Sequence, residues 1–420
     1  MTNSIKQNFL FLVFFFLNKL FKLVINCESM LIGLVGRPSV GKSTFFKAAT
    51  LSDVAIASYP FTTIKPNHAM AYVKIKDLAR EFDKVSNPRE GFIKGEWRFV
   101  SFELMDVAGL VAGASEGKGL GNEFLNDLSN ADALIQVVDM SGESDAEGKP
   151  TENHYPGEDI RVIENELDLW FLGILQKVWK SFSKKIQVEK KDFSEAVSIQ
   201  FSGLKVKEEI VKKIILKHNF DIEHPAQWNE EEITRFAREL RRTSKPMIIA
   251  ANKVDRPNGK ANLEKVKAEF DYEIVPCFAE GELALKEADK TGVIEYIPGE
   301  NKFEIKKDLN EKQQQGLDKI KEIIGEYGST GVQDVLNKSI FEMLGYLAIY
   351  PAGSKLADSK GNILPDCFLM PPGSTALDFA FRLHSDIGKN FVKAISIKTK
   401  KAVGKDYELK NGDGLEILTR

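Results

Sequence analysis

The chain has 420 residues, of which 43% are hydrophobic and 28% charged, a balance typical of a globular protein with two or three domains. Its formal net charge of −3 excludes nucleic-acid or membrane binding driven by overall charge, so any such contact must come from a local patch. The three cysteines, Cys27, Cys277 and Cys367, lie far apart without a CxxC pair. This spacing supports neither a zinc site nor a disulfide framework, and it favours a reducing, cytoplasmic location.

The first 29 residues differ in composition from the rest of the chain. Residues 9–17 are all apolar, but a run of this length is too short to span a bilayer, which needs roughly 20 residues. The residues before Met30 form no convincing signal-peptide cleavage site. Met30 directly precedes the first predicted strand, so we expect translation to start there and expect no stable membrane association. A membrane-interacting leader is the alternative.

After Met30, apolar runs alternate with helical patterns, which predicts an α/β fold with a mainly parallel sheet. Strands are expected at residues 31–35, 97–106, 133–139, 247–251 and 273–278. Helices are expected at residues 42–49, 206–216, 230–242, 309–327 and 332–344. A further long helix is indicated by Ile163, Leu167 and Phe171, which share one helix face.

These patterns divide the chain into five parts. We expect an N-terminal extension (residues 1–29) and a nucleotide-binding α/β domain in two pieces (30–155 and 243–300). A helical insertion (156–242) separates the two pieces, and a helical connector (301–344) and a C-terminal domain of short strands (345–420) follow. Several lysines between residues 177 and 191 form either a solvated helix face or a surface that contacts RNA or the ribosome.

A GxxxxGKS motif follows the first strand and opens a helix, which is the context that a phosphate-binding P-loop requires. Its glycines let backbone N–H groups surround the phosphates, and the helix N-terminus adds positive potential. We expect Lys42 to reach the β- and γ-phosphates and the Ser43 hydroxyl to bind Mg²⁺. The nucleotide-binding residues predicted here are Gly36, Arg37, Pro38, Ser39, Val40, Gly41, Lys42, Ser43 and Thr44.

Two segments further along are expected to complete the phosphate and metal site. Asp106 ends a strand and begins a DxxG motif, so its carboxylate can hold Mg²⁺ while the Gly109 N–H meets the γ-phosphate. Thr63, which we favour over the neighbouring Thr62, lies in a loop between the P-loop and Asp106, where a threonine can coordinate Mg²⁺ only while the γ-phosphate is present. The catalytic set predicted here is Lys42, Thr63 and Gly109, and the metal ligands are Ser43, Thr63 and Asp106.

The base-reading motif is the NKxD sequence of Asn252, Lys253 and Asp255, which follows an apolar strand. The Asp255 carboxylate can accept from guanine N1–H and from the exocyclic amine, whereas adenine offers no such donor pair, so GTP is the expected substrate. Phe278, Ala279 and Glu280 end the next strand, and the Ala279 N–H is expected to donate to guanine O6.

These residues resemble the Obg superfamily of GTPases. The resemblance rests on GRPSVGKSTFF, on YPFTT, and on DVAGLVAGASEGKGLGNEFL, whose glycines form a long second switch. The helical insertion and the sequence VPCFAEGELALKEADKTG resemble the YchF-like branch, especially its archaeal type. The C-terminal sequences LPD, PGST and LHSDIG resemble a TGS domain, a small β-grasp module.

The resemblance implies a slow, Mg²⁺-dependent switch that hydrolyses GTP to GDP, with ribosome or RNA contact through the TGS and helical domains. Well-studied YchF proteins lack NKxD and prefer ATP, so an ATP-hydrolysing regulator is one alternative, and an RNA-binding module controlled by nucleotide is another. Ser39 stands where many relatives have a potassium-binding asparagine, which leaves potassium activation open. Leu110 stands where Ras-like enzymes carry the glutamine that orients water, which predicts a low intrinsic rate.

Overall fold

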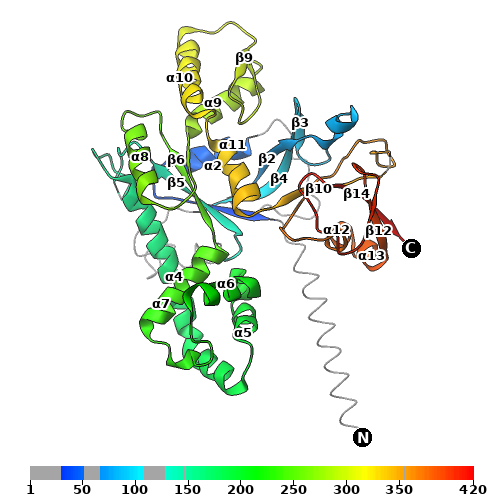
Figure 1. The fold of residues 1–420 in the computed structure, drawn as a ribbon. Coiled ribbons are helices and arrows are strands. Elements are labelled where there is room, and N and C mark those ends of the chain that lie inside the picture. Colours follow the sequence, from blue (N-terminus) through cyan, green and yellow to red (C-terminus); the bar gives the residue numbers. More distant parts are fainter. Residues whose placement is uncertain (1–29, 52–66, 108–127, 146, 354) are drawn as a thin grey trace. The chain divides into compact units, whose positions relative to one another are not determined.

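The computed structural model describes residues 30–51, 67–107, 128–145, 147–353 and 355–420 (Figure 1). The chain forms two compact units. One, here called the sheet unit, contains Leu31–Lys74 and Ser101–Leu344. The other, here called the C-terminal unit, contains Ile75–Val100 and Gly345–Arg420. Within the described ranges, no helix has the length and apolar character needed to cross a membrane.

The main sheet has the strand order β2-β4-β1-β5-β6-β7, and β3 pairs with the first part of β4. The pairs β1–β4, β1–β5, β5–β6 and β6–β7 are parallel, which confirms the predicted mainly parallel sheet. Its strands are β1 (Leu31–Val35), β2 (His68–Lys76), β3 (Phe92–Lys94), β4 (Trp97–Asp106), β5 (Ala133–Asp139), β6 (Met247–Asn252) and β7 (Ile274–Pro276). The strands β1, β5 and β6 are buried along their whole length, as the continuous apolar runs of a covered parallel sheet predict.

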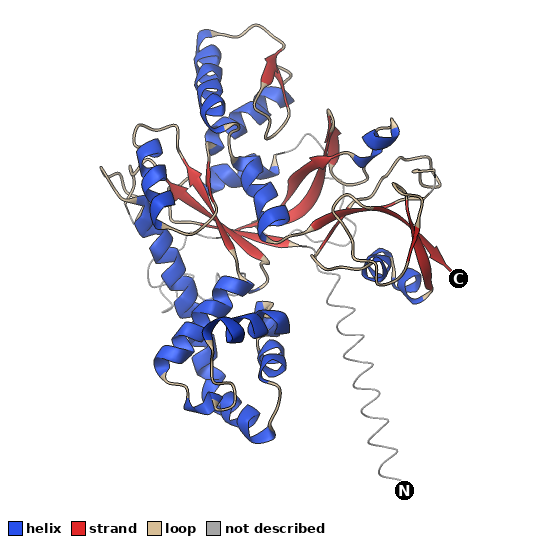
Figure 2. Cartoon of the chain, viewed as in Figure 1, coloured by secondary structure: helices blue, strands red, loops and turns tan. Residues whose placement is uncertain are grey.

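Helices and one small hairpin complete the sheet unit. Figure 2 shows that the helices of the insertion gather in a region without strands, except for the first part of α4, which lies beside the main sheet. The helices of the insertion are α4 (Pro156–Glu189), α5 (Phe193–Gln200), α6 (Glu208–His218) and α7 (Glu230–Ser244). The remaining elements are α2 (Lys42–Thr50), α8 (Gly259–Glu269), α9 (Ala279–Lys290), β8 (Ile294–Tyr296), β9 (Phe303–Ile305), α10 (Glu311–Tyr327) and α11 (Val332–Asn337).

Two predicted elements end earlier than expected. The strand predicted at 273–278 stops at Pro276, and after the Cys277 N–H has donated to the Ala251 carbonyl of β6, the Phe278 N–H turns to the Thr330 carbonyl at 2.8 Å. The helix predicted at 332–344 changes after Asn337 into a π-helical turn over Lys338–Met343. There the Ser339 hydroxyl donates to the Val335 carbonyl at 2.6 Å and competes with the regular helical bond.

The C-terminal unit contains a five-stranded sheet of order β11-β10-β14-β12-β13, in which only the β10–β14 pair is parallel. In one cluster of its core, Ala376 and Phe379 of α12 pack with the strand residues Ile349 and Leu415. The elements are β10 (Leu347–Pro351), β11 (Phe368–Met370), α12 (Ala376–Leu383), α13 (Ser385–Lys389), β12 (Phe391–Ser396), β13 (Ala402–Val403) and β14 (Gly414–Thr419).

Residues 75–100 pack with this C-terminal sheet, although they lie far away in sequence. Leu78 and Ala79 belong to the same buried cluster as Tyr350 and Leu364. The sequence pattern gave no signal for this association, because a strand pattern such as that of residues 97–106 does not say which sheet or cluster its neighbours will join. The five predicted part boundaries remain a prediction.

Candidate functional site

The GxxxxGKS segment joins β1 to α2 at the carboxyl edge of the parallel sheet. Gly41 caps α2 in the left-handed conformation, with φ of 92°. A side chain there would be strained, and its Cβ would also lie 2.3 Å from Asn252 Nδ2. The first turn of α2 carries no acidic residue, so its free N–H groups leave a positive end at this edge.

Lys42 and Asp106 meet at the same edge from different elements. Lys42 Nζ forms an ion pair with Asp106 Oδ1, and the two side chains are partly buried. The end of β4 is held beside β1, because the Val107 N–H donates to the Leu34 carbonyl at 3.1 Å. The structure therefore brings together the cation predicted for phosphate and a carboxylate predicted for Mg²⁺, with Ser43 exposed in the adjacent turn of α2.

Asn252, the last residue of β6, connects the P-loop and the loop before α9. Its Nδ2 donates to the Val40 carbonyl at 3.0 Å, and its Oδ1 accepts from the Ala279 N–H at 3.1 Å. Because Asn252 is 3% exposed, this side chain acts as a buried brace between the P-loop and the start of α9. The Ala279 N–H, which the sequence assigns to guanine O6, is thus already engaged within the protein.

Lys253 is held by two acceptors that lie on different loops. Its Nζ donates to the Ser39 carbonyl at 3.0 Å and to Asp139 Oδ2 at 2.6 Å. Asp139 ends β5, is 2% exposed, and also accepts from the Ser141 N–H and from the Ser144 hydroxyl. Sequence reasoning missed Asp139, although its place at the end of a buried parallel strand is a usable signal for a site residue.

Arg37, the second residue of the P-loop motif, lies in a buried cluster with Asp159 and His154. Its guanidinium forms an ion pair with Asp159 at 2.5 Å and lies 2.9 Å from His154 Nε2. Burial raises the pKa of Asp159, and the nearby His154 and Arg37 oppose that rise. Arg37 therefore ties the P-loop to the first turn of α4. The sequence placed Arg37 among the nucleotide-binding residues and did not predict this partner.

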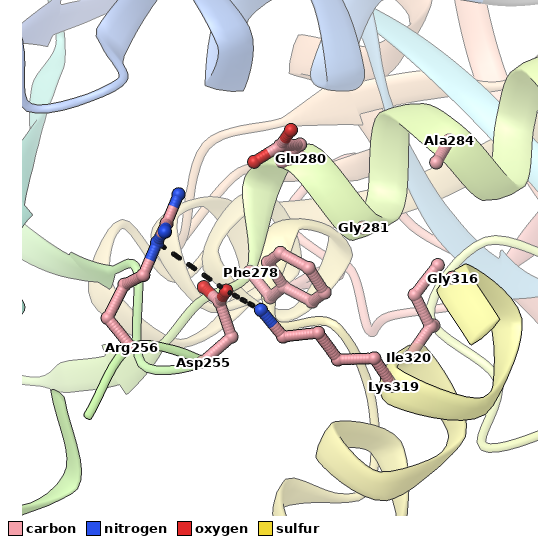
Figure 3. Close-up of a pocket in the computed structure, with 9 residues that line it drawn as sticks. All are labelled: Asp255, Arg256, Phe278, Glu280, Gly281, Ala284, Gly316, Lys319 and Ile320. Carbon is pink, nitrogen blue, oxygen red and sulfur yellow. Dashed lines mark hydrogen bonds and ion pairs between the residues drawn. The ribbon is translucent and has the colours of Figure 1, made fainter. Parts of the chain in front are cut away.

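Asp255, Phe278 and Glu280 border two adjoining cavities next to the P-loop. The larger has a volume of about 280 Å³ and is shown in Figure 3, where helix α10 supplies one wall through Lys319 and Ile320. The smaller, of about 70 Å³, extends toward α2 and is lined by Gly41, Thr44, Asn252, Lys253, Asp255, Arg256, Phe278 and Glu280. Five of the six predicted base-reading residues thus line the smaller cavity, and Ala279 lines neither cavity. The motifs did not predict the wall that α10 adds to the larger one.

Two predicted catalytic residues are not placed by the structure. Thr63 and Gly109 lie outside the described residues, in the stretches 52–66 and 108–127. Their roles, and that of Leu110, stay predictions from sequence.

Comparison with known proteins gives three family matches. A 50S ribosome-binding GTPase model matches residues 31–168, the G4 motif-containing domain of the Obg-like GTPase YGR210-like model matches residues 250–353, and a TGS domain model matches residues 351–419. Fold, motifs and matches together define a P-loop GTPase with a C-terminal TGS domain.

Similar proteins span almost the whole chain. A GTP-binding protein of Methanocaldococcus jannaschii is 46% identical, over 93% of this chain and 99% of its own. The crystal structure of a GTP-binding protein from Pyrococcus horikoshii is 36% identical with a TM-score of 0.75, and covers 93% of this chain and 100% of that one. A protein of Bacillus subtilis named as the ribosome-binding ATPase YchF is 28% identical, over 91% and 96%. The chain belongs to the Obg-like GTPases, in their YchF-like branch.

Proposed function

We propose that this protein binds GTP with Mg²⁺ and hydrolyses it slowly to GDP and phosphate, as a switch that acts at the ribosome. The observation that carries the nucleotide part is the meeting of Lys42 with Asp106 beside the N-terminus of α2. A cation, free backbone N–H groups and a carboxylate in one place suit a triphosphate and its metal ion.

The oxygen donors at this edge fit a magnesium ion. The Ser43 hydroxyl and the Asp106 carboxylate, together with Thr63 in the undescribed stretch, are hard oxygen ligands of the kind that Mg²⁺ takes. Bound Mg²⁺ would neutralise charge on the β- and γ-phosphate oxygens. The protein's own part is to hold the phosphates with the P-loop N–H groups and Lys42, and to stabilise the charge of the transition state.

The choice of GTP rests on Asp255. Its carboxylate faces the recess next to the P-loop, where it can accept from the two donors of guanine. With the Ala279 N–H engaged by Asn252, the next free N–H of the α9 first turn, that of Glu280, is the donor we assign to guanine O6. Because the Bacillus subtilis relative is named an ATPase, hydrolysis of ATP is the competing reaction to measure.

The proposed action at the ribosome rests on the name of the Bacillus subtilis relative, and the TGS and helical regions are the surfaces that we propose for the contact.

The deciding experiment measures phosphate release from GTP and from ATP, with and without Mg²⁺ and with and without ribosomes. We expect slow, Mg²⁺-dependent hydrolysis of GTP that ribosomes accelerate. Lys42→Ala should abolish it, whereas Lys47→Ala, at the exposed end of the same helix, should leave it unchanged. Equal turnover of ATP, or turnover that survives Lys42→Ala, would refute the proposal.

A further inference from the structure

Helix α10 carries a lysine to the carboxylate that reads the base. Lys319 Nζ donates to Asp255 Oδ2 at 2.7 Å. The side chain of Asp255 is 4% exposed and that of Lys319 is 48% exposed, so the pair joins a buried carboxylate to a cation at the cavity rim. Figure 3 shows Lys319 and Arg256 approaching Asp255 from two sides, but Arg256 Nε is 3.9 Å away, which is beyond hydrogen-bonding distance.

The lysine also borders the space that the base would fill. Its Nζ lies 5.6 Å from the centroid of the Phe278 ring, within the range of a cation–π contact. Gly316 and Ile320, from the same helix, line the cavity beside it. Helix α10 therefore forms part of the wall of the base recess.

The chain beyond the C-terminal end of α10 is fixed to the loop after β7 and to α9. Beyond α10, the Thr330 carbonyl accepts from the Phe278 N–H at 2.8 Å, and the Thr330 hydroxyl donates to Glu282 at 2.5 Å. A Cβ on Gly331, whose φ is +83°, would lie 1.9 Å from the Pro276 carbonyl oxygen, so the two segments are in direct contact. These contacts fix the position of α10, and with it Lys319, relative to the loop after β7 that contains Phe278.

We propose that Lys319 is a positioning residue that determines base specificity, by holding the Asp255 carboxylate ready to accept from both guanine donors. This inference rests on the proposed GTP-binding function. An ionised carboxylate has about four acceptor sites, so the bond from Lys319 to Oδ2 leaves enough for guanine N1–H and the exocyclic amine. The ion pair restricts rotation of the carboxylate in its nearly buried position and leaves its other acceptor sites for the base.

The exocyclic amine of guanine makes it possible to distinguish a positioning role of Lys319 from a general contribution to the stability of the fold. Inosine nucleotides keep N1–H and O6 but lack that amine, so the affinity ratio of GDP to IDP reports how well Asp255 is placed for its second hydrogen bond. A merely structural role of Lys319 would weaken both nucleotides by the same factor.

The test is to measure dissociation constants for GDP and IDP with the unmodified protein, Lys319→Met, Lys319→Arg and Lys312→Met. Methionine keeps the length and the contact with Phe278 but removes the charge, and Lys312 is an exposed lysine on the same helix. We expect Lys319→Met to weaken both nucleotides but GDP about tenfold more than IDP, as loss of the additional bond to the amine implies. Lys319→Arg should restore the preference, and Lys312→Met should leave it unchanged.

Three results would overturn the inference. Equal weakening of GDP and IDP would make Lys319 a structural residue only. Unchanged or tighter GDP binding by Lys319→Met would show that the lysine is idle or blocks the recess. If the unmodified protein bound no GDP, the proposed function would fail as well, whereas GDP preference that is indifferent to Lys319 would leave that function standing.

Discussion

At the scale of single residues, the base-reading carboxylate makes the sharpest prediction. Asp255→Asn places an amide donor opposite the guanine amine, and a buried donor left unpaired costs roughly 1–3 kcal/mol. Xanthine has a carbonyl at that position, so the variant should bind XDP better than GDP. Asp318→Asn, an exposed change on α10, is the control and should alter neither affinity. Retention of the GDP preference by Asp255→Asn would mean that another group selects the base.

A second residue links stability to pH. Lys245 Nζ donates to the Ser129 and Ala131 carbonyls, each at 2.5 Å, and burial together with nearby Lys205 lowers its pKa to about 7. In the unfolded chain this lysine has an ordinary pKa of about 10.4. Between these values the unfolded chain binds more protons, so the free energy of unfolding rises with pH.

We therefore expect the unmodified protein to gain stability relative to Lys245→Met as pH rises from 7 to 10, with a limiting slope of about 1.4 kcal/mol per pH unit. Below pH 7 the difference should be constant, because both states are then protonated. Urea unfolding of the two proteins across this pH range is the measurement. Lys245→Met also leaves two carbonyls unpaired, which lowers its free energy of unfolding by the same amount at every pH. Only the change of the stability difference with pH therefore reports the lowered pKa. Parallel curves would contradict the lowered pKa.

At the scale of elements, the helical insertion is held by aromatic packing. Trp228 stacks on Phe220, with ring centroids 4.8 Å apart, and lies 5.1 Å from the ring of Trp179. Phe236 of α7 packs edge-on against Trp228 at 5.2 Å. Because these rings come from different segments of the insertion, their contacts order it as one body rather than as separate helices.

Trp228→Ala should therefore destabilise the insertion by roughly 3–5 kcal/mol, the usual loss for a buried aromatic side chain. The measurement is urea unfolding followed by helical circular dichroism. Ile199→Ala on α5 is the matched control, since Ile199 is 67% exposed and should contribute less than about 0.5 kcal/mol. A loss at Trp228 no larger than that at Ile199 would show that the ring cluster does not stabilise the insertion.

At the scale of the whole molecule, the C-terminal unit depends on a segment from far earlier in the chain. Arg98 is 1% exposed and donates to the carbonyls of Leu364 and Pro365 at 2.5 and 2.9 Å. Its guanidinium also lies 5.4 Å from the centroid of the Tyr350 ring. A buried cation with these partners fastens residues 75–100 to the C-terminal sheet.

Arg98→Leu should loosen this unit by roughly 3 kcal/mol, because two buried carbonyls lose a charged donor. Limited proteolysis should then cut residues 345–420 faster than in the unmodified protein. Arg89→Leu removes exposed ion pairs to Asp358 and Asp366, and pairs of this kind contribute at most about 1 kcal/mol. Equal cleavage rates for the two variants would contradict the anchoring role of Arg98.

The sequence alone determined the fold class and the nucleotide motifs, because local rules govern both. A GxxxxGKS turn needs a strand before it and a helix after it, and the buried strand ending in Asp106 could be placed from its residue pattern. Tertiary structure alone decided which distant groups meet: Asp139 with Lys253, Asp159 with Arg37, Arg98 with Leu364, and Lys319 with Asp255. These pairs depend on how distant segments of the chain pack together, which no short stretch of sequence reveals. A charged residue is the same in the sequence whether its side chain lies in solvent or contacts a buried partner.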